Sequence, residues 1–363
     1  MKHWTISAAM ALSALAGAAQ DVTAFIDYMD RLYVFDRGTI RQIEPRKPIA
    51  LHVGGNYLAY TDNRDDLKVY WNGRTQVIDR AMDLEPIVTD HYMGFTVAGI
   101  LKVFDGKTRV MTPNLGMYVV EDSLAVFKDE VQGKIMVYYK EEKVKLEDQL
   151  AGNAVVDFGS GDNVFAWVSS FDRLFKVFYH GEIYELSDLV TGMDFKCGLD
   201  LVAYRDAYDH TFKAFHQGTI YDLEEQMPQR FEVGKGILAW LDLTGSLKIF
   251  EGGQVFKAMD FEPQHWEVVD SLVVVQDRGF FNVFNRGRFH ELERAVPLKW
   301  KASWGTMAYV DVDRTLKVWR KGITDVVVRG QPVQDFRVDR GLVIARLNVN
   351  TARIWWRGET YDH

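Results

Sequence analysis

Aspartate residues recur at one place in this sequence and are its clearest candidates for chemistry. They stand two residues after an apolar-aromatic segment such as Leu58-Ala59-Tyr60. The series is Asp27, Asp62, Asp129, Asp206, Asp242, Asp277 and Asp311. Carboxylates at regular spacing could collect Ca²⁺, but aspartate also closes hairpin turns by accepting backbone amides. Because no unit carries the alternating acidic ligands of a calcium loop, we interpret them as turn residues and predict no metal site.

Other reactive side chains also have structural explanations. Cys197, the single cysteine, takes the place of Val233 in a later repeat, which predicts a buried, inert thiol. Repeated lysines are expected to cover aromatic strands with their stems and to reach solvent and nearby acids with their ammonium groups. These lysines are Lys68, Lys102, Lys176, Lys213, Lys248 and Lys317.

Motifs for catalysis and cofactor binding are missing from the sequence. The nine histidines form no pair at metal-ligand spacing, and no nucleophile elbow, phosphate loop or dinucleotide fingerprint occurs. We therefore predict no catalytic residue and no cofactor, and the sequence leans away from an enzyme. A site assembled in space from several repeats would leave no such spacing, so an enzyme stays open as the alternative.

Three side chains are candidates for ligand contact: His265, Trp304 and Trp356. His265 lies in a long link between repeats, where recognition residues concentrate on rigid scaffolds. The two tryptophans fall one step away from the positions that the repeat uses for its core. The competing interpretation is that all three fill space between repeats.

Composition narrows the class of partner. The 363 residues carry 43 Lys and Arg against 51 Asp and Glu, a net charge of -8. This balance supplies no basic field for phosphates, which argues against nucleic acid as a partner.

The first residues have the pattern of a signal peptide. Lys2 precedes an apolar stretch that ends in small residues at Ala16, Gly17 and Ala18. We predict a signal peptide over residues 1–19 and one domain over residues 20–363. No later stretch is long and apolar enough to span a membrane. The chain is expected to be exported, to a bacterial periplasm or to the outside of the cell.

Residues 20–363 consist of one unit repeated about ten times. An aromatic residue marks each copy at a period near 35 residues. The marker residues are Phe35, Tyr70, Phe104, Tyr138, Phe178, Phe215, Phe250, Phe284, Trp319 and Trp355. A large residue lies nine positions before the second-strand marker in eight units. These residues are Leu51, Tyr118, Phe158, Phe195, Phe231, Trp266, Trp300 and Phe336. Residues 80–93 depart from the pattern.

Each unit predicts four short antiparallel strands. In one copy the strands cover 230–233, 237–241, 246–250 and 254–258, joined by links short enough for hairpins. Such sheets must stack on their neighbours to bury both faces. We predict an all-β propeller, with eight to ten blades in one ring or two smaller rings; an open β-solenoid is the alternative. The first unit lacks one strand, which favours a ring closed by a blade shared between the two termini.

The period and the meander resemble those of exported bacterial β-propeller repeat proteins. The Gly-His and Trp-Asp signatures of the WD repeat are not present. The resemblance is to an architecture rather than to a named family, and it transfers no functional residue.

Two functions follow from these observations. The first is an exported, non-catalytic binding or scaffold propeller whose loop face meets a protein or glycan partner. It rests on the ten Trp and 16 Tyr residues, which are favoured contact anchors. The alternative is a hydrolase or lyase whose carboxylates converge on the central channel. Its site would be built in irregular units, such as residues 80–93 and 128–134.

Overall fold

The computed structural model describes residues 21–80, 84–148, 157–169, 171–188, 193–348 and 350–363. All regular elements in these ranges are β-strands, and they form ten antiparallel sheets. The predicted signal peptide, residues 1–19, lies outside the described residues. Within the described ranges we find no helix of the length and apolarity needed to cross a membrane.

The strands follow one another in chain order, and each sheet is a blade. Blade 1 holds β1 (Val22–Ile26), β2 (Leu32–Asp36) and β3 (Thr39–Glu44). Blade 2 holds β4 (Ala50–Val53), β5 (Tyr57–Thr61), β6 (Asp66–Trp71) and β7 (Arg74–Arg80). Blade 3 holds β8 (Ile87–Val88), β9 (Met93–Val97), β10 (Ile100–Phe104) and β11 (Thr108–Thr112). Blade 4 holds β12 (Leu115–Val120), β13 (Leu124–Asp129), β14 (Lys134–Tyr139) and β15 (Glu142–Asp148).

The next three blades repeat this order. Blade 5 holds β16 (Asp157–Gly161), β17 (Val164–Val168), β18 (Phe175–Tyr179) and β19 (Glu182–Ser187). Blade 6 holds β20 (Phe195–Gly198), β21 (Leu201–Arg205), β22 (Phe212–His216) and β23 (Thr219–Glu224). Blade 7 holds β24 (Arg230–Val233), β25 (Ile237–Leu241), β26 (Leu247–Glu251) and β27 (Gln254–Met259).

The last three blades complete the ring. Blade 8 holds β28 (His265–Val269), β29 (Leu272–Asp277), β30 (Phe280–Asn285) and β31 (Arg288–Glu293). Blade 9 holds β32 (Lys299–Ser303), β33 (Thr306–Val310), β34 (Leu316–Arg320) and β35 (Ile323–Val328). Blade 10 holds β36 (Asp335–Asp339), β37 (Leu342–Arg346), β38 (Ala352–Trp356) and β39 (Glu359–Asp362).

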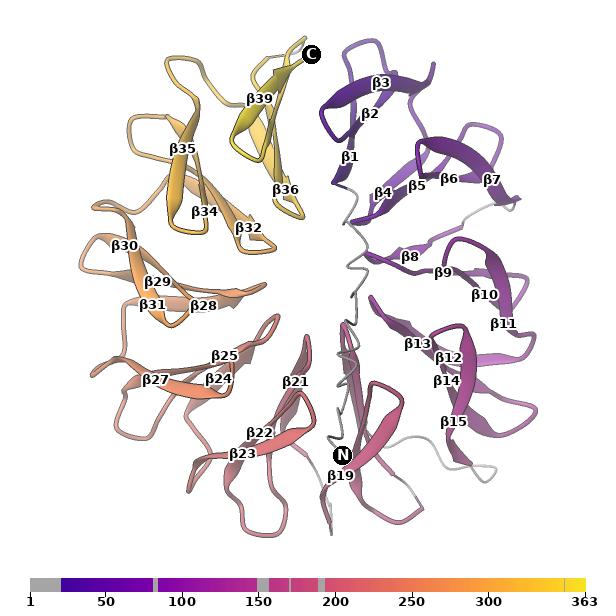
Figure 1. Ribbon diagram of the computed structural model, residues 1–363, viewed down its shortest axis with the longest axis vertical. Helices are drawn as coiled ribbons and strands as arrows, with labels where there is room; N and C mark the ends of the chain where they lie inside the picture. The colour runs from indigo at the N-terminus through magenta and orange to yellow at the C-terminus, as the bar shows by residue number, and fades with distance from the viewer. Residues whose placement is uncertain (1–20, 81–83, 149–156, 170, 189–192, 349) are drawn as a thin grey trace, which may run out of the picture.

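The blades stand in one ring, with their first strands toward the central axis and their last strands at the rim (Figure 1). The prediction of an all-β propeller is confirmed, and of its alternatives the single ring of ten blades is correct. The irregularity expected in residues 80–93 is also present, since β8 has only two residues.

Burial explains the composition of the strands. The second strand of each blade is buried over most of its length, and entirely in β5, β17 and β25, because it is covered by sheets on both sides. Rim strands such as β27 expose alternate side chains. The apolar core is therefore a series of layers between neighbouring blades, and the repeated aromatic residues fill these layers.

Most of the recurrent aspartates accept backbone amides in the hairpin between the second and third strands. Oδ1 of Asp242 accepts the backbone amides of Thr244 at 2.8 Å and Ser246 at 2.9 Å. Its other oxygen lies 3.1 Å from Nζ of Lys248, which is also 2.6 Å from Glu224 on the preceding blade. The interpretation as turn residues is confirmed for Asp242, and the lysine links two blades.

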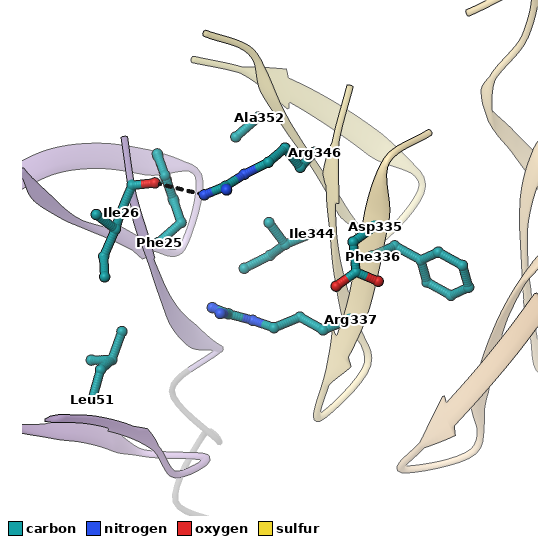
Figure 2. Close-up of a pocket in the computed structure, with 9 residues that line it drawn as sticks. All are labelled: Phe25, Ile26, Leu51, Asp335, Phe336, Arg337, Ile344, Arg346 and Ala352. Carbon is teal, nitrogen blue, oxygen red and sulfur yellow. Dashed lines mark hydrogen bonds between the residues drawn. The ribbon is translucent and has the colours of Figure 1, made fainter. Parts of the chain in front are cut away.

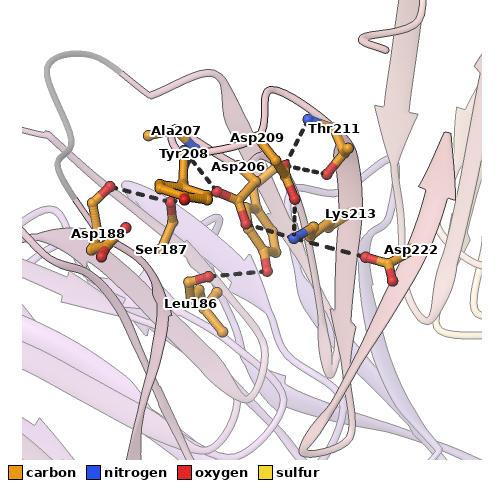
Figure 3. A network of polar contacts seen from close by, with 11 residues as sticks. Leu186, Ser187, Asp188, Asp206, Ala207, Tyr208, Asp209, Thr211, Lys213 and Asp222 are labelled. Carbon is orange, nitrogen blue, oxygen red and sulfur yellow. Dashed lines mark hydrogen bonds and ion pairs between the residues drawn. The ribbon is translucent and has the colours of Figure 1, made fainter. Parts of the chain in front are cut away.

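The same arrangement recurs around the ring with local variation. In blade 6, Lys213 lies 2.7 Å from Asp206 and 3.0 Å from Asp209, and Asp206 also accepts the hydroxyl of Ser187 (Figure 3). Sequential blades are thus joined by polar contacts as well as by apolar packing.

The ring closes differently from the prediction. The expectation that the two termini share a blade is wrong, because β1–β3 and β36–β39 are separate sheets. Side chains join them: Phe25 and Phe35 pack against Leu342 and Ile344, and Thr23 donates to Asp339 at 2.6 Å. Blade 1 contributes only three described strands.

Candidate binding site on the ring axis

The turns between first and second strands bring charged side chains from different blades to one pocket. A cavity of about 340 Å³ on the ring axis is lined by seven residues from these turns, together with residues of the adjoining strands. The seven turn residues are Asp90, Asp122, Asp162, Lys235, Asp270, Trp304 and Arg340. We call this cavity the axial pocket.

Tight hairpins place these residues where the blades converge. In blade 9, Trp304 and Gly305 form a two-residue loop with φ of 49° and 64°. In blade 10, Arg340 and Gly341 do the same with φ of 50° and 89°. Two successive positive φ angles define the turn that matches the twist of a hairpin. The turn therefore holds the first side chain at the inner end of the blade.

Two cations lie among the carboxylates. Arg340 pairs with Asp90, which belongs to a blade distant in sequence. Nζ of Lys235 lies 2.8 Å from Asp162 and 3.7 Å from Asp122. Since these contacts connect non-adjacent blades, they join the blades across the ring axis.

Trp304 lies between the same two cations. Nζ of Lys235 is 4.3 Å from the centroid of its ring, and the guanidinium carbon of Arg340 is 4.5 Å away. Such contacts stabilise a cation on an aromatic face. Trp304 therefore orients Lys235 and Arg340 as well as lining the pocket.

Burial makes three carboxyl groups at or beside the pocket difficult to ionise. Burial, together with the charge of Asp122, raises the pKa of Asp90 to about 7. Burial also raises the pKa of Asp162 and of Glu121, which flanks Asp122. Burial alone would lower the pKa of Lys235, but the hydrogen bond to Asp162 and the neighbouring carboxylates raise it. The pocket thus favours positive charge.

Several polar atoms at this place have no hydrogen-bond partner within the described residues. They include Oδ1 of Asp270, Nε of Arg340 and the hydroxyl of Tyr57. Tyr57 is 1% exposed, and the charges of Asp122 and Asp90 help to raise its pKa. Unpaired buried polar atoms cost free energy. Asp270 and Arg340 line the axial pocket, whereas Tyr57 lies outside its lining.

The pH dependence of stability tests the electrostatics of Asp90. Between about pH 4 and pH 7 the folded chain keeps a proton on Asp90 that the unfolded chain has released. The contribution of Asp90 to stability therefore falls as the pH rises through this window, by up to about 1.4 kcal/mol per pH unit. We expect Asp90→Asn to flatten this dependence in urea unfolding measured at several pH values.

Asp209→Asn is the matched control for this measurement. Hydrogen bonds from Thr211 lower the pKa of Asp209 to about 2, so it titrates below the window. The control should keep the wild-type slope. An Asp90→Asn slope equal to the wild-type slope would show that Asp90 is ionised throughout.

The structure brings only one of the three predicted contact residues to the axial pocket. Trp304 lines it. His265 begins β28, whose other end leads to Asp270, so it lies at the opposite face of the ring, 3.0 Å from Glu267. Trp356 lies at the seam of the ring, where its Nε1 donates to Asp21 at 2.8 Å and its ring packs against Phe35.

The charged residues of the pocket were not singled out individually from the sequence. Asp90 falls within the irregular residues 80–93, which the alternative function identified as a place for a site. Asp122, Asp162 and Lys235 occupy the fourth position after the repeat marker residues Tyr118, Phe158 and Phe231. Comparing that one position across the repeats would have shown them.

Metal binding is not indicated by the geometry. Across the described ranges, no group of three or more His, Cys, Asp or Glu side chains is arranged to hold a metal ion. Cys197 is partly buried in an apolar cluster, and burial raises the pKa of its thiol.

Fold and pocket together define a ten-bladed propeller with a charged pocket on its axis. The chain belongs to the family of 10-bladed beta propeller domains, whose model matches residues 16–361. A comparison with curated proteins finds no match.

Three solved structures illustrate the wider similarity. The computationally designed Ika8 protein shares 17% identity, with 85% of this chain and 96% of that chain covered and a TM-score of 0.32. The CRINKLY WD40 ectodomain of the Arabidopsis thaliana receptor kinase ACR4 shares 9% identity, with 66% and 93% covered and a TM-score of 0.32. KlHsv2 with loop 6CD replaced by a Gly-Ser linker shares 12% identity, with 65% and 91% covered and a TM-score of 0.32.

Proposed function

We propose that this chain is an exported binding propeller that holds a partner by a cationic group in the axial pocket. One observation carries the proposal: four aspartates converge on the pocket with only two described cations among them, Lys235 and Arg340. A fifth lining aspartate, Asp339, is paired with Arg337 at 2.7 Å. An ammonium or guanidinium group would balance the remaining charge.

The raised pKa values support this reading of the pocket. A carboxylate whose pKa is raised by burial gains most from a cation that enters its site. The pKa values of Asp162 and Asp90 are raised even though Lys235 and Arg340 lie beside them. The unpartnered Oδ1 of Asp270 supplies a further acceptor. Lysine and arginine side chains of a protein partner have the required chemistry.

Export is a part of the proposal that rests on the sequence. Lys2, the apolar stretch after it and the small residues Ala16 to Ala18 support a signal peptide over residues 1–19. The intact mass of the protein from its native host tests this. A mature chain that begins near Gln20 supports export with cleavage, whereas a chain that begins at Met1 contradicts it.

Peptide binding tests the axial pocket. Fluorescein-labelled pentalysine and pentaarginine are the probes, with pentaglutamate as the control peptide, and anisotropy is the readout. We expect the cationic peptides to bind and Asp162→Asn to weaken them about tenfold, equal to about 1.4 kcal/mol. Asp209→Asn, which removes an acid from a hairpin elsewhere on the ring, should bind as the wild type does. Equal weakening in both variants would show that binding follows net charge and not the pocket.

Catalysis is the second candidate function, and Asp90 favours it. A carboxyl group with a pKa of about 7 is suited to general acid–base catalysis near neutral pH. Asp122, whose Oδ1 accepts the backbone amide of Asp90 at 2.6 Å, is its neighbour. Turnover of aryl glycosides or peptide substrates that Asp90→Asn abolishes would establish a hydrolase. Binding without turnover favours the binding propeller.

A further inference from the structure

Among the described residues, blade 1 has no strand at the position that the other nine blades place nearest the axis. Its first described strand, β1, corresponds to the second strand elsewhere: Phe25 stands where Tyr60 and Trp240 stand in β5 and β25. The other nine sheets each have four strands. Within the described residues, no strand therefore pairs with the inner edge of β1.

Blade 2 identifies the groups on this edge. There, Tyr57 accepts the amide of Gly54 at 3.0 Å and Thr61 accepts that of Ile49 at 2.8 Å, so alternate residues of β5 face the inner strand. By the repeat, Val22, Ala24 and Ile26 face the corresponding position in blade 1.

Arginine side chains of blade 10 occupy that position. Arg337 donates to the carbonyl of Ala24, and Arg346 donates to the carbonyl of Ile26 at 3.1 Å. These guanidinium groups stand where backbone amides of an inner strand would donate. Solvent-accessible side chains can exchange such partners when a strand enters.

Other seams show what Arg337 would do beside an inner strand. Lys196 and Lys301 have the same register position in blades 6 and 9. Each donates to a carbonyl of the next inner strand, at Phe231 and Phe336 respectively, at 2.7 Å. Each also lies over the ring of that phenylalanine, at 4.8 and 5.7 Å from the centroid. The register thus provides for an aromatic residue at the missing position.

A cavity of about 300 Å³ marks the missing strand. Blade 1 supplies Phe25 and Ile26, blade 2 supplies Leu51, and blade 10 supplies Phe336, Ile344 and both arginines (Figure 2). Figure 2 shows Arg337 and Arg346 extending from blade 10 toward β1 across this space. We call this cavity the strand slot.

We propose that the strand slot binds an extended segment of a partner protein, which adds to β1 as the fourth strand of blade 1 with an aromatic side chain beneath Arg337. This rests on the proposed export with cleavage, since a mature chain beginning at Gln20 has only two residues before β1 at Val22. Such a chain is too short to fill the slot itself. Strand addition to an open sheet edge is a general mode of peptide recognition.

One hydrogen bond links the wall of the slot to the wall of the axial pocket. Thr23 of β1 donates to Asp339, which lines the axial pocket beside Arg340. Inner strands run toward the turns that form that pocket. A segment added antiparallel to β1 would therefore deliver its following residues to the carboxylates, which joins the two binding elements in one partner.

A peptide copying residues 228–235 tests the slot, because it reproduces the inner strand of blade 7 with Phe231 at the aromatic position. The labelled peptide is titrated into the chain that begins at Gln20. We expect binding that Arg337→Ala weakens about tenfold, through loss of a carbonyl donor and of an aromatic contact. Lys301→Ala is the matched control at the same register position, at a seam already filled by β36, and it should bind normally.

Variants of the peptide distinguish strand addition from nonspecific binding. Phe231→Ala in the peptide should weaken binding by removing the aromatic ring, and Glu232→Pro should abolish it by removing a ladder amide. No binding, or equal binding to Arg337→Ala and Lys301→Ala chains, would overturn the proposal. So would a self-associating chain whose dimer the peptide dissociates, because a second copy would then fill the slot.

Failure of the slot and failure of the axial pocket are distinguishable. Asp162→Asn should weaken pentalysine while leaving the aromatic peptide bound through its strand. A native protein that retains residues 1–19 and does not bind the peptide would also overturn the proposal. Its own chain, and not a partner protein, would then occupy the slot.

Discussion

Replacing Lys235 with methionine is expected to destabilise the chain by about 3–5 kcal/mol at neutral pH, the range found when one partner of a buried ion pair is removed. Lys235 lies within ion-pair distance of Asp162 and Asp122 and stacks on Trp304. Methionine keeps most of the apolar stem but leaves the carboxylates uncompensated. Urea unfolding at pH 7 measures the loss.

The effect of Lys235→Met should shrink at acidic pH. Protonation of Asp162 removes the charge that Lys235 neutralises, and burial already raises the pKa of this carboxyl. Lys257→Met is the control, because Lys257 pairs with Asp260 where both side chains are more than half exposed. The control should change stability by less than about 0.5 kcal/mol. A loss for Lys235→Met that does not vary with pH would indicate a packing effect instead.

Replacing Phe35 with alanine is expected to cost about 3–5 kcal/mol, as for other large buried side chains, and also to loosen the ring. Phe35 is fully buried, with Trp356 and Tyr361 of blade 10 at 5.8 and 5.1 Å between ring centroids. No link of the chain joins blades 1 and 10. Urea unfolding measures the first effect, and the radius of gyration from X-ray scattering measures the second.

Phe250→Ala separates the two effects. Phe250 is also fully buried and packs against Tyr221 and His216 of the preceding blade at 5.1 and 5.6 Å. Blades 6 and 7 remain joined by the chain. We expect a similar loss of stability with no increase in the radius of gyration. Equal radii for the two variants would show that the seam is no weaker than an internal interface.

Repetition made the fold predictable. Trp240, Phe250 and their counterparts recur because each fills the same layer between blades, so a single spacing describes the core of the whole ring. Asp242 was assigned correctly for the same reason, and Asp62 and Asp311 accept backbone amides in equivalent hairpins. Features that all blades share can be predicted from the spacing of the sequence repeat.

The axial pocket is formed by residues that differ from blade to blade. Its turn position holds Asp162 in one blade, Lys235 in another and Trp304 in a third, so averaging over repeats hides it. Trp304 was selected because it departs from the core pattern, and His265 was selected for its place in a link. Sequence spacing does not distinguish the two faces of the ring, which is why His265 and Trp304 were grouped together.

Ring closure was mispredicted because a missing strand has two structural solutions. A short first unit could share a blade with the C-terminal strands or stand as an incomplete sheet. The choice depends on which sheet the last strand joins, and β39 pairs with β38 and completes blade 10. The unpaired edge of β1 follows from this arrangement.

The position of the seam has a consequence for how such rings change in size. Because the seam falls between two blades and is closed by side chains, each blade is encoded by one uninterrupted stretch of about 35 residues. Duplication or loss of one stretch would add or remove a whole blade while leaving both edges of the seam intact. In a ring whose N- and C-terminal strands share one blade, that shared blade would have to be kept each time a stretch is duplicated or lost. Each blade therefore corresponds to one continuous segment of the sequence, which could be gained or lost as a unit.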